Sequence, residues 1–165
     1  MLKNLTATYK GLITGVAMIV ACIVCYFALH IPFNSKEQFV VFAIYTAGII
    51  WCLLDFNSNN KEEYKLKAYF QEGFKVFVVV TLLMVIYSIV FYKMETGIRD
   101  AWIANNNVEL LKEGNHMPPE IAENARQMKT MFLPMMVGIN LFKYLIIGVL
   151  ITVITGGFLI SQKKN

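Results

Sequence analysis

Lys143 is the residue best placed to do chemistry, because it is a single cation inside the long apolar run 131–160. Asn140 lies one helical turn earlier, so a helix would place both side chains on one face. An ionisable group deep in a bilayer is costly and often marks a pathway. A hydrocarbon core takes about 20 residues, and the uninterrupted apolar stretch 144–160 favours a position of Lys143 near the boundary, where it would snorkel. Lys143 and Asn140 are therefore the candidates for an intramembrane polar site.

Metal and redox motifs are poorly developed in this sequence. Cys22 and Cys25 form a C-x-x-C motif, but they lie in an apolar run with no second pair, so we expect small packing residues. Cys52 also lies in an apolar run. His30 and His116 are near prolines, and no carboxylate or cysteine is spaced to complete a metal site with them. The sequence therefore predicts no metal and no cofactor.

A nucleophilic site would require Ser88 or Thr81 to meet Lys143 across two helices. Serine and threonine inside a membrane usually hydrogen-bond to their own helix or to a neighbour. We therefore expect no catalytic residue and no enzymatic activity.

The composition is that of a membrane protein. Of the 165 residues, 57% are hydrophobic and 16% are charged, whereas a typical soluble domain has about 25% charged residues. The mean hydropathy is +0.55. A net charge of +4 is too small and too dispersed to indicate nucleic-acid binding. The length fits one domain.

Four apolar segments predict an all-α integral membrane bundle of four transmembrane helices, at about 11–31, 38–56, 73–92 and 134–160. The first apolar run exceeds the ~7–15 residues of a cleavable signal core, so we expect it to be retained. The extramembrane stretch 93–130 is predicted to be helical, with a stop at Gly114 and a new start after Pro118 and Pro119. The last helix is expected to enter the membrane near Pro134, after an interfacial turn at about 131–142.

The second half of the extramembrane loop carries one apolar stripe, formed by Ile121, Ala125, Met128 and Phe132 at helical spacing. Such a helix lies along the membrane interface or over the mouth of the bundle, or it packs on the other half of the loop. The spacing alone leaves both alternatives open.

Small residues indicate where helices approach closely. Gly148, Thr152 and Gly156 recur at every fourth position of the last helix and predict a packing face within the protein. Gly11 and Gly15 form a G-x-x-x-G pair at the start of the first helix.

The distribution of basic residues predicts the orientation, because cytoplasmic segments are enriched in Lys and Arg. The side that holds both termini has the higher density of these residues, so both termini are predicted to be cytoplasmic. Asp55 lies at a helix boundary, and we expect it to be solvated rather than functional.

Three short features suggest a family. Tyr9-Lys10-Gly11-Leu12-Ile13 opens the first helix, and Phe70-Gln71-Glu72-Gly73-Phe74-Lys75 opens the third. An acidic, methionine-containing loop then runs into Pro134 and Gly138, and the last helix ends in Lys163-Lys164. The chain resembles the small four-helix bacterial membrane proteins known as domain of unknown function 4199, which are typical of Bacteroidota. The resemblance implies a multi-pass inner-membrane protein, and it carries over no catalytic or binding residue.

The functional expectation is a non-enzymatic inner-membrane protein that acts by association with a partner or with the cell envelope. The alternative is a small permease or channel subunit that uses Asn140 and Lys143. The expected partners are the lipid bilayer and a membrane protein or a second copy of the chain, and no nucleic acid is expected.

Overall fold

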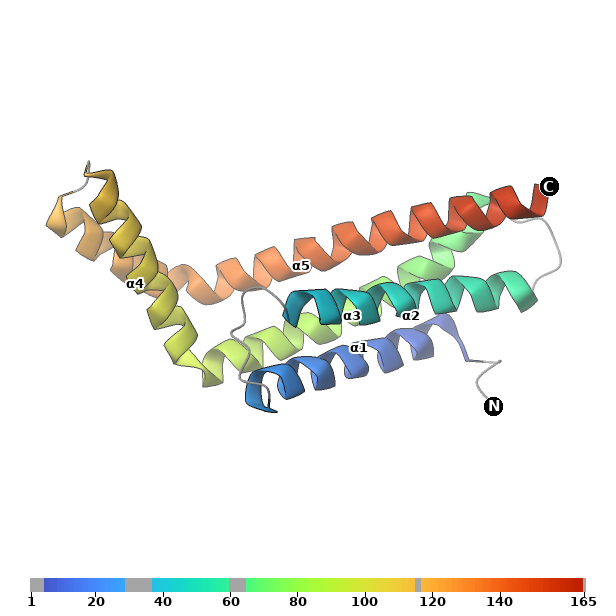
Figure 1. The fold of residues 1–165 in the computed structure, drawn as a ribbon, viewed down its shortest axis with the longest axis horizontal. Coiled ribbons are helices and arrows are strands. Elements are labelled where there is room, and N and C mark those ends of the chain that lie inside the picture. The colour runs from blue at the N-terminus through green and yellow to red at the C-terminus, as the bar shows by residue number, and fades with distance from the viewer. Residues whose placement is uncertain (1–4, 29–36, 60–64, 115–116, 165) are drawn as a thin grey trace. The chain divides into compact units, whose positions relative to one another are not determined.

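The computed structural model describes residues 5–28, 37–59, 65–114 and 117–164 (Figure 1). These residues form helices and contain no strand. In chain order the elements are α1 (Ala7–Ile23), the π-helical turn η1 (Val24–Ala28), α2 (Glu37–Asn59), α3 (Leu66–Met94), α4 (Thr96–Glu113) and α5 (Pro118–Lys164). The all-α class predicted from the sequence is confirmed.

Two helices begin earlier than predicted. α1 starts at Ala7 because the hydroxyl of Thr6 accepts a hydrogen bond from the backbone N–H of Tyr9 at 3.4 Å and so caps the first turn. α3 starts at Leu66, within the polar stretch that precedes the predicted span, and runs without interruption into the apolar segment. Hydropathy locates the apolar part of a helix, whereas its first turn depends on caps and polar residues.

α5 begins at Pro118, well before the start predicted near Pro134, and passes through Pro134 without a break. A proline inside a helix costs about 3 kcal/mol. Phe132 is 2% exposed and Ile121 is 7% exposed on the same helix, and burying each such side chain contributes about 1.5–3 kcal/mol. Packing of this part of α5 therefore outweighs the proline. The predicted stop at Gly114 is confirmed, since Gly114 ends α4 in the left-handed conformation at φ 70°.

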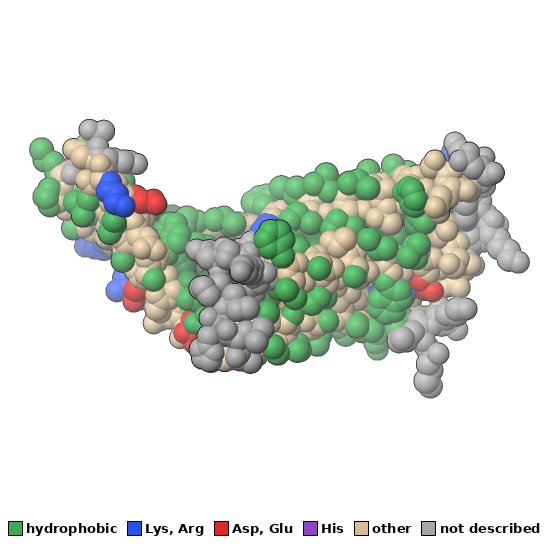
Figure 2. Space-filling view, viewed as in Figure 1, with side chains coloured by type: hydrophobic (Ala, Val, Ile, Leu, Met, Phe, Trp, Pro, Cys, Tyr) green, Lys and Arg blue, Asp and Glu red, His purple; other side chains and the backbone are tan. Residues whose placement is uncertain are grey.

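In the part of the chain that the structure describes, four helices are long and apolar enough to cross a membrane: Ala7–Phe27, Phe39–Asn59, Leu66–Met94 and Pro118–Gln162. Large apolar side chains cover their outer faces, including Val16, Leu82, Ile146, Leu150 and Ile154. Figure 2 shows this hydrophobic flank on the face in view. Such a surface fits a multi-pass membrane protein, because lipid tails rather than water would contact it.

The chain divides into two compact units. The first, called the bundle unit below, comprises Met1–Met84 and Leu141–Asn165, and the second, the hairpin unit, comprises Val85–Asn140. α1, α2, the first part of α3 and the end of α5 form the bundle unit, and α1 and α2 run alongside each other (Figure 1). Its core is made of fully buried side chains that include Met18, Tyr45, Ile49, Tyr69 and Phe77.

The hairpin unit is built around aromatic side chains. The ring of Phe132 on α5 lies 5.5 Å from that of Tyr92 and 6.0 Å from that of Trp102 on α4. Ile103 and Ile121 are buried in the same unit. Phe132, at the end of the apolar stripe, therefore packs against Trp102 in the other half of the loop, as one of the predicted alternatives describes.

Candidate functional site

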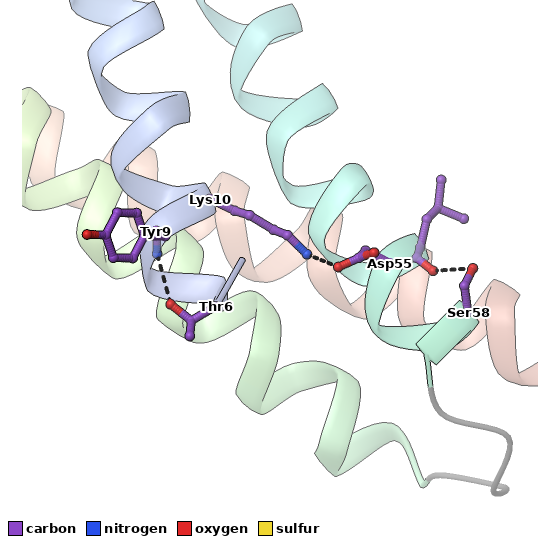
Figure 3. Close-up of polar contacts among 6 residues, drawn as sticks. Thr6, Tyr9, Lys10, Asp55 and Ser58 are labelled. Carbon is purple, nitrogen blue, oxygen red and sulfur yellow. Dashed lines mark hydrogen bonds and ion pairs between the residues drawn. The ribbon is translucent and has the colours of Figure 1, made fainter. Parts of the chain in front are cut away.

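A buried ion pair joins the first two helices of the bundle unit (Figure 3). The ammonium of Lys10, in the first turns of α1, donates to Oδ2 of Asp55, near the end of α2. The side chains are 3% and 16% exposed, respectively. The Lys10 ammonium also lies 5.5 Å from the centre of the Trp51 ring. The expectation that Asp55 is solvated is therefore wrong.

The sequence contained a signal for this pair. Lys10 directly precedes the first predicted apolar segment, 11–31, and Asp55 lies one residue before the end of the second, 38–56. A short connection makes the two helices antiparallel, so these two residues lie at similar positions along the helix axes. Because an unpaired buried charge is costly, a cation and a carboxylate at such positions are expected to form an ion pair.

The chemistry available to this pair is limited by its own geometry. The Lys10 ammonium is held by a carboxylate and an aromatic face, and the Thr14 hydroxyl donates to the backbone carbonyl of Lys10 at 2.8 Å. A neutralised pair with little exposure stabilises the contact between α1 and α2 and offers little free charge to a ligand.

Lys143, the principal candidate from the sequence, lies in the bundle unit beside two aromatic rings. Its ammonium is 5.6 Å from the centre of the Phe42 ring and 5.3 Å from that of Tyr144. The Tyr45 hydroxyl donates to the backbone carbonyl of Tyr144 at 2.9 Å, which fixes the neighbouring turn of α5 against α2. Lys143 itself is half-buried.

The contact with Phe42 indicates how far Lys143 lies from the end of the α2 span. The candidate span of α2 begins at Phe39, and three residues of helix advance about 5 Å. Lys143 therefore lies near one end of the α2 span rather than at its middle. The Lys10–Asp55 pair lies at the other end, since Asp55 is four residues from Asn59, where the span ends.

Asn140, the second candidate, belongs to the hairpin unit. Its side chain is buried, and its amide Nδ2 donates to the Ser88 hydroxyl at 3.2 Å. Thr81 in the bundle unit donates to the backbone carbonyl of Phe77 at 2.7 Å. Ser88, Thr81 and Asn140 therefore each have a hydrogen-bond partner that does not involve Lys143.

The predicted packing residues lie against other helices of the bundle unit. A Cβ at Gly148 would lie 2.6 Å from Cβ of Phe77, and one at Gly156 would lie 3.0 Å from Cβ of Tyr69. Thr152 is fully buried against Gly73.

Gly11 and Gly15 lie against α3 in the same way. A Cβ at Gly11 would lie 3.0 Å from the Val76 carbonyl oxygen, and one at Gly15 would lie 2.6 Å from Cδ1 of Leu83. The backbones of α1 and α3 therefore approach closely at Gly11, and at Gly15 the Leu83 side chain fills the space that a Cβ would take.

The cysteines offer no assembled site in the part of the chain that the structure describes. Cys22, Cys25 and Cys52 are buried and form no disulfide. No group of three His, Cys, Asp or Glu side chains placed to hold a metal ion occurs among the described residues. His30 and His116 lie outside them.

An open groove of about 420 Å³ lies between α4 and α5 in the hairpin unit. It is lined by Asp100, Ile103, Ala104, Asn107, Ala125, Arg126 and Lys129. Nε of Arg99 donates to Oδ1 of Asp100 at 2.9 Å. This hydrogen bond, helped by the charges of Arg99 and Lys129, lowers the pKa of Asp100 below its ordinary value. The groove is thus lined by the carboxylate of Asp100, whose ionised form is favoured, and by the cations of Arg126 and Lys129.

Comparison with known proteins identifies a family. No curated protein and no solved structure matches the chain. The model of a family described as "Protein of unknown function (DUF4199)" matches residues 9–160, which is nearly the whole sequence. The chain therefore belongs to the DUF4199 family, as its short motifs suggested.

Proposed function

We propose that this protein is a non-enzymatic, multi-pass protein of the bacterial inner membrane that acts by binding a partner through its hairpin unit. The observation that carries the proposal is the groove between α4 and α5, where Asp100 faces the same opening as Arg126 and Lys129. Charges of both signs around an open groove suit a partner with complementary charges, because such surfaces set specificity and orientation.

The packing of the bundle unit supports this assignment. Its buried lysine is paired with Asp55, and the hydroxyls of Thr14, Tyr45 and Thr81 donate to backbone carbonyls. Polar groups satisfied in this way stabilise a bundle, whereas a transport pathway needs polar groups that face a passage.

The proposed orientation places both termini in the cytoplasm and therefore the loop between the third and fourth spans in the periplasm. This assignment rests on the higher density of basic residues on the terminal side. The partner is then another inner-membrane protein with a periplasmic surface, or a second copy of the chain.

Charge reversal in the groove tests the proposal. Arg126→Glu combined with Lys129→Glu should remove the co-purifying partner after chemical crosslinking in intact membranes and mild solubilisation. Lys112→Glu on α4 is the matched control, because Lys112 is exposed and does not line the groove. Unchanged recovery of the partner with the doubly reversed variant, at equal expression, would refute the proposal.

A permease or channel subunit is the second candidate function, and the half-buried ammonium of Lys143 favours it. In that case Lys143→Met should abolish solute or ion flux into reconstituted vesicles, while Lys67→Met, at an exposed position, should leave the flux unchanged. Flux that persists in the Lys143 variant would remove this residue from any transport mechanism.

A further inference from the structure

Lys10 and Lys143, two lysines of the bundle unit that are at least half-buried, have different surroundings. Lys10 is 3% exposed in its side chain and has Asp55 as its counterion. Lys143 is half-buried, and none of the carboxylates whose side chains the structure describes forms an ion pair with it. Its ammonium lies beside the rings of Phe42 and Tyr144. Among the described side chains, the charge of Lys143 therefore has aromatic rings and no carboxylate beside it.

The position of Lys143 along the bundle indicates where an anionic partner would come from. Phe42, which lies beside the ammonium, is about 5 Å from the beginning of the α2 span. A hydrocarbon core is about 30 Å thick, and the headgroup phosphates lie just beyond it. The ammonium thus lies about 5 Å inside the end of the span, a depth from which a lysine can reach the phosphate layer.

The surface around Lys143 faces lipid. Phe142 and Ile146 on α5 are 63% and 57% exposed, and Phe39, one turn from Phe42 on α2, is 78% exposed. Large apolar side chains exposed to this degree on a span contact acyl chains rather than water. Acyl chains would therefore cover the exposed side chains that flank Lys143 on α5.

We propose that Lys143, Phe42 and Tyr144 form a binding site for the phosphate of an anionic phospholipid. The two ring faces hold the ammonium by cation–π attraction and fix its direction before a lipid arrives. The phosphodiester oxygens would accept charge-assisted hydrogen bonds from the ammonium. An anionic lipid is favoured over a zwitterionic one, because the headgroup ammonium of a zwitterionic lipid already compensates its phosphate.

Native mass spectrometry of the purified protein tests the site, with phosphatidylglycerol and phosphatidylcholine titrated in parallel. Lys143→Met should lower the affinity for phosphatidylglycerol about five-fold, which corresponds to about 1 kcal/mol for one lysine near an anionic surface. The affinity for phosphatidylcholine should change little. Lys143→Arg should keep the preference, and Lys67→Met is the control at an exposed lysine.

Further arms separate the possible outcomes. Phe42→Leu keeps the lysine and should weaken the preference for phosphatidylglycerol, which tests the ring even if a Lys143 variant fails to fold. Inorganic phosphate at millimolar concentration should not displace the bound lipid, and efficient displacement would identify a site for free phosphate instead. Equal binding of phosphatidylglycerol by Lys143→Met and by the unmodified protein would overturn the proposal.

Discussion

Removing either partner of the ion pair between α1 and α2 should destabilise the bundle unit, and removing Asp55 should cost more than removing Lys10. Asp55→Asn leaves the Lys10 ammonium without its counterion in a position where the side chain is 3% exposed. Removing one partner of a buried pair costs about 3–5 kcal/mol, and we expect about 3 kcal/mol here because the pair lies near the end of the spans. Lys10→Met leaves the Asp55 carboxylate, whose side chain is 16% exposed and can recruit water, so about 2 kcal/mol is expected.

The double variant distinguishes pairing from simple loss of packing. Lys10→Met with Asp55→Asn removes both charges and should cost only about 2 kcal/mol, because no unpaired charge remains in the bundle unit. The coupling free energy between the two positions is then about 3 kcal/mol.

The surface pair Lys75–Glu72 is the matched comparison, with Nζ and Oε1 at 2.6 Å and the lysine side chain 51% exposed. Its coupling free energy should stay below about 1 kcal/mol.

Trp51 provides the assay, because its ring lies beside the Lys10 ammonium. Reversible unfolding in mixed micelles, followed by tryptophan fluorescence, reports the free energy of unfolding of each variant. A Trp102→Phe background removes the signal of the other tryptophan, which lies in the hairpin unit. A coupling free energy no larger than that of the surface pair would refute the reasoning.

Two further predictions concern close packing and the acid side of the pH range. Gly48→Ala should destabilise the bundle unit by about 1–3 kcal/mol, because its Cβ would overlap the buried Thr14 side chain. Gly157→Ala is the control, because no atom lies within 4 Å of the added Cβ. It should change the free energy of unfolding by less than about 0.5 kcal/mol in the same micelle assay. Equal effects of the two substitutions would contradict the packing argument. Arg99→Gln should raise the pKa of Asp100 toward its ordinary value, which NMR titration of the carboxyl carbon measures. Because the pKa of Asp100 is lowered in the folded protein, its contribution to stability is present above the unfolded value of about 3.9 and is lost as the pH falls through the folded pKa. An unchanged titration in the Arg99 variant would exclude that hydrogen bond as the cause.

The sequence predicted the helical class and the four apolar spans because both depend on length and composition. A run of about 20 apolar residues has one stable conformation in lipid, whatever its neighbours are. The starts of α1 and α3 were missed because a hydroxyl cap and a polar first turn carry no hydropathy signal.

The start predicted for the last helix near Pro134 differs from the observed start at Pro118 for another reason. Local propensity disfavours proline inside a helix, but the burial of Phe132 and Ile121 in the hairpin unit outweighs that cost. Tertiary packing of this kind is not visible in a local window of sequence.

The surroundings of the charged residues could be predicted only in part. Because the first two helices are antiparallel, Lys10 and Asp55 lie at similar positions along the bundle axis. Whether the two side chains point toward each other also depends on how each helix is rotated about its own axis, which the sequence does not give. For Lys143, the length argument favoured the membrane boundary, and its contact with Phe42 places it near the end of the α2 span. The two aromatic rings beside it come partly from another helix, so no spacing within its own segment reveals them.

The contacts between threonine and glycine in the bundle unit also limit how its helices can align during assembly. Thr14 on α1 is seated against Gly48 on α2, and Thr152 on α5 is seated against Gly73 on α3. Sliding α5 along α3 by about one turn, roughly 5.4 Å, would move Thr152 from Gly73 to Tyr69 or Phe77, where a large side chain occupies the same space. Helices that enter the bilayer separately and then associate would therefore meet a steric barrier if α5 joined α3 one turn out of place. The fit of a threonine against a glycine thus favours one alignment by shape, in addition to the polar bonds from Lys10 to Asp55 and from Tyr45 to the Tyr144 carbonyl.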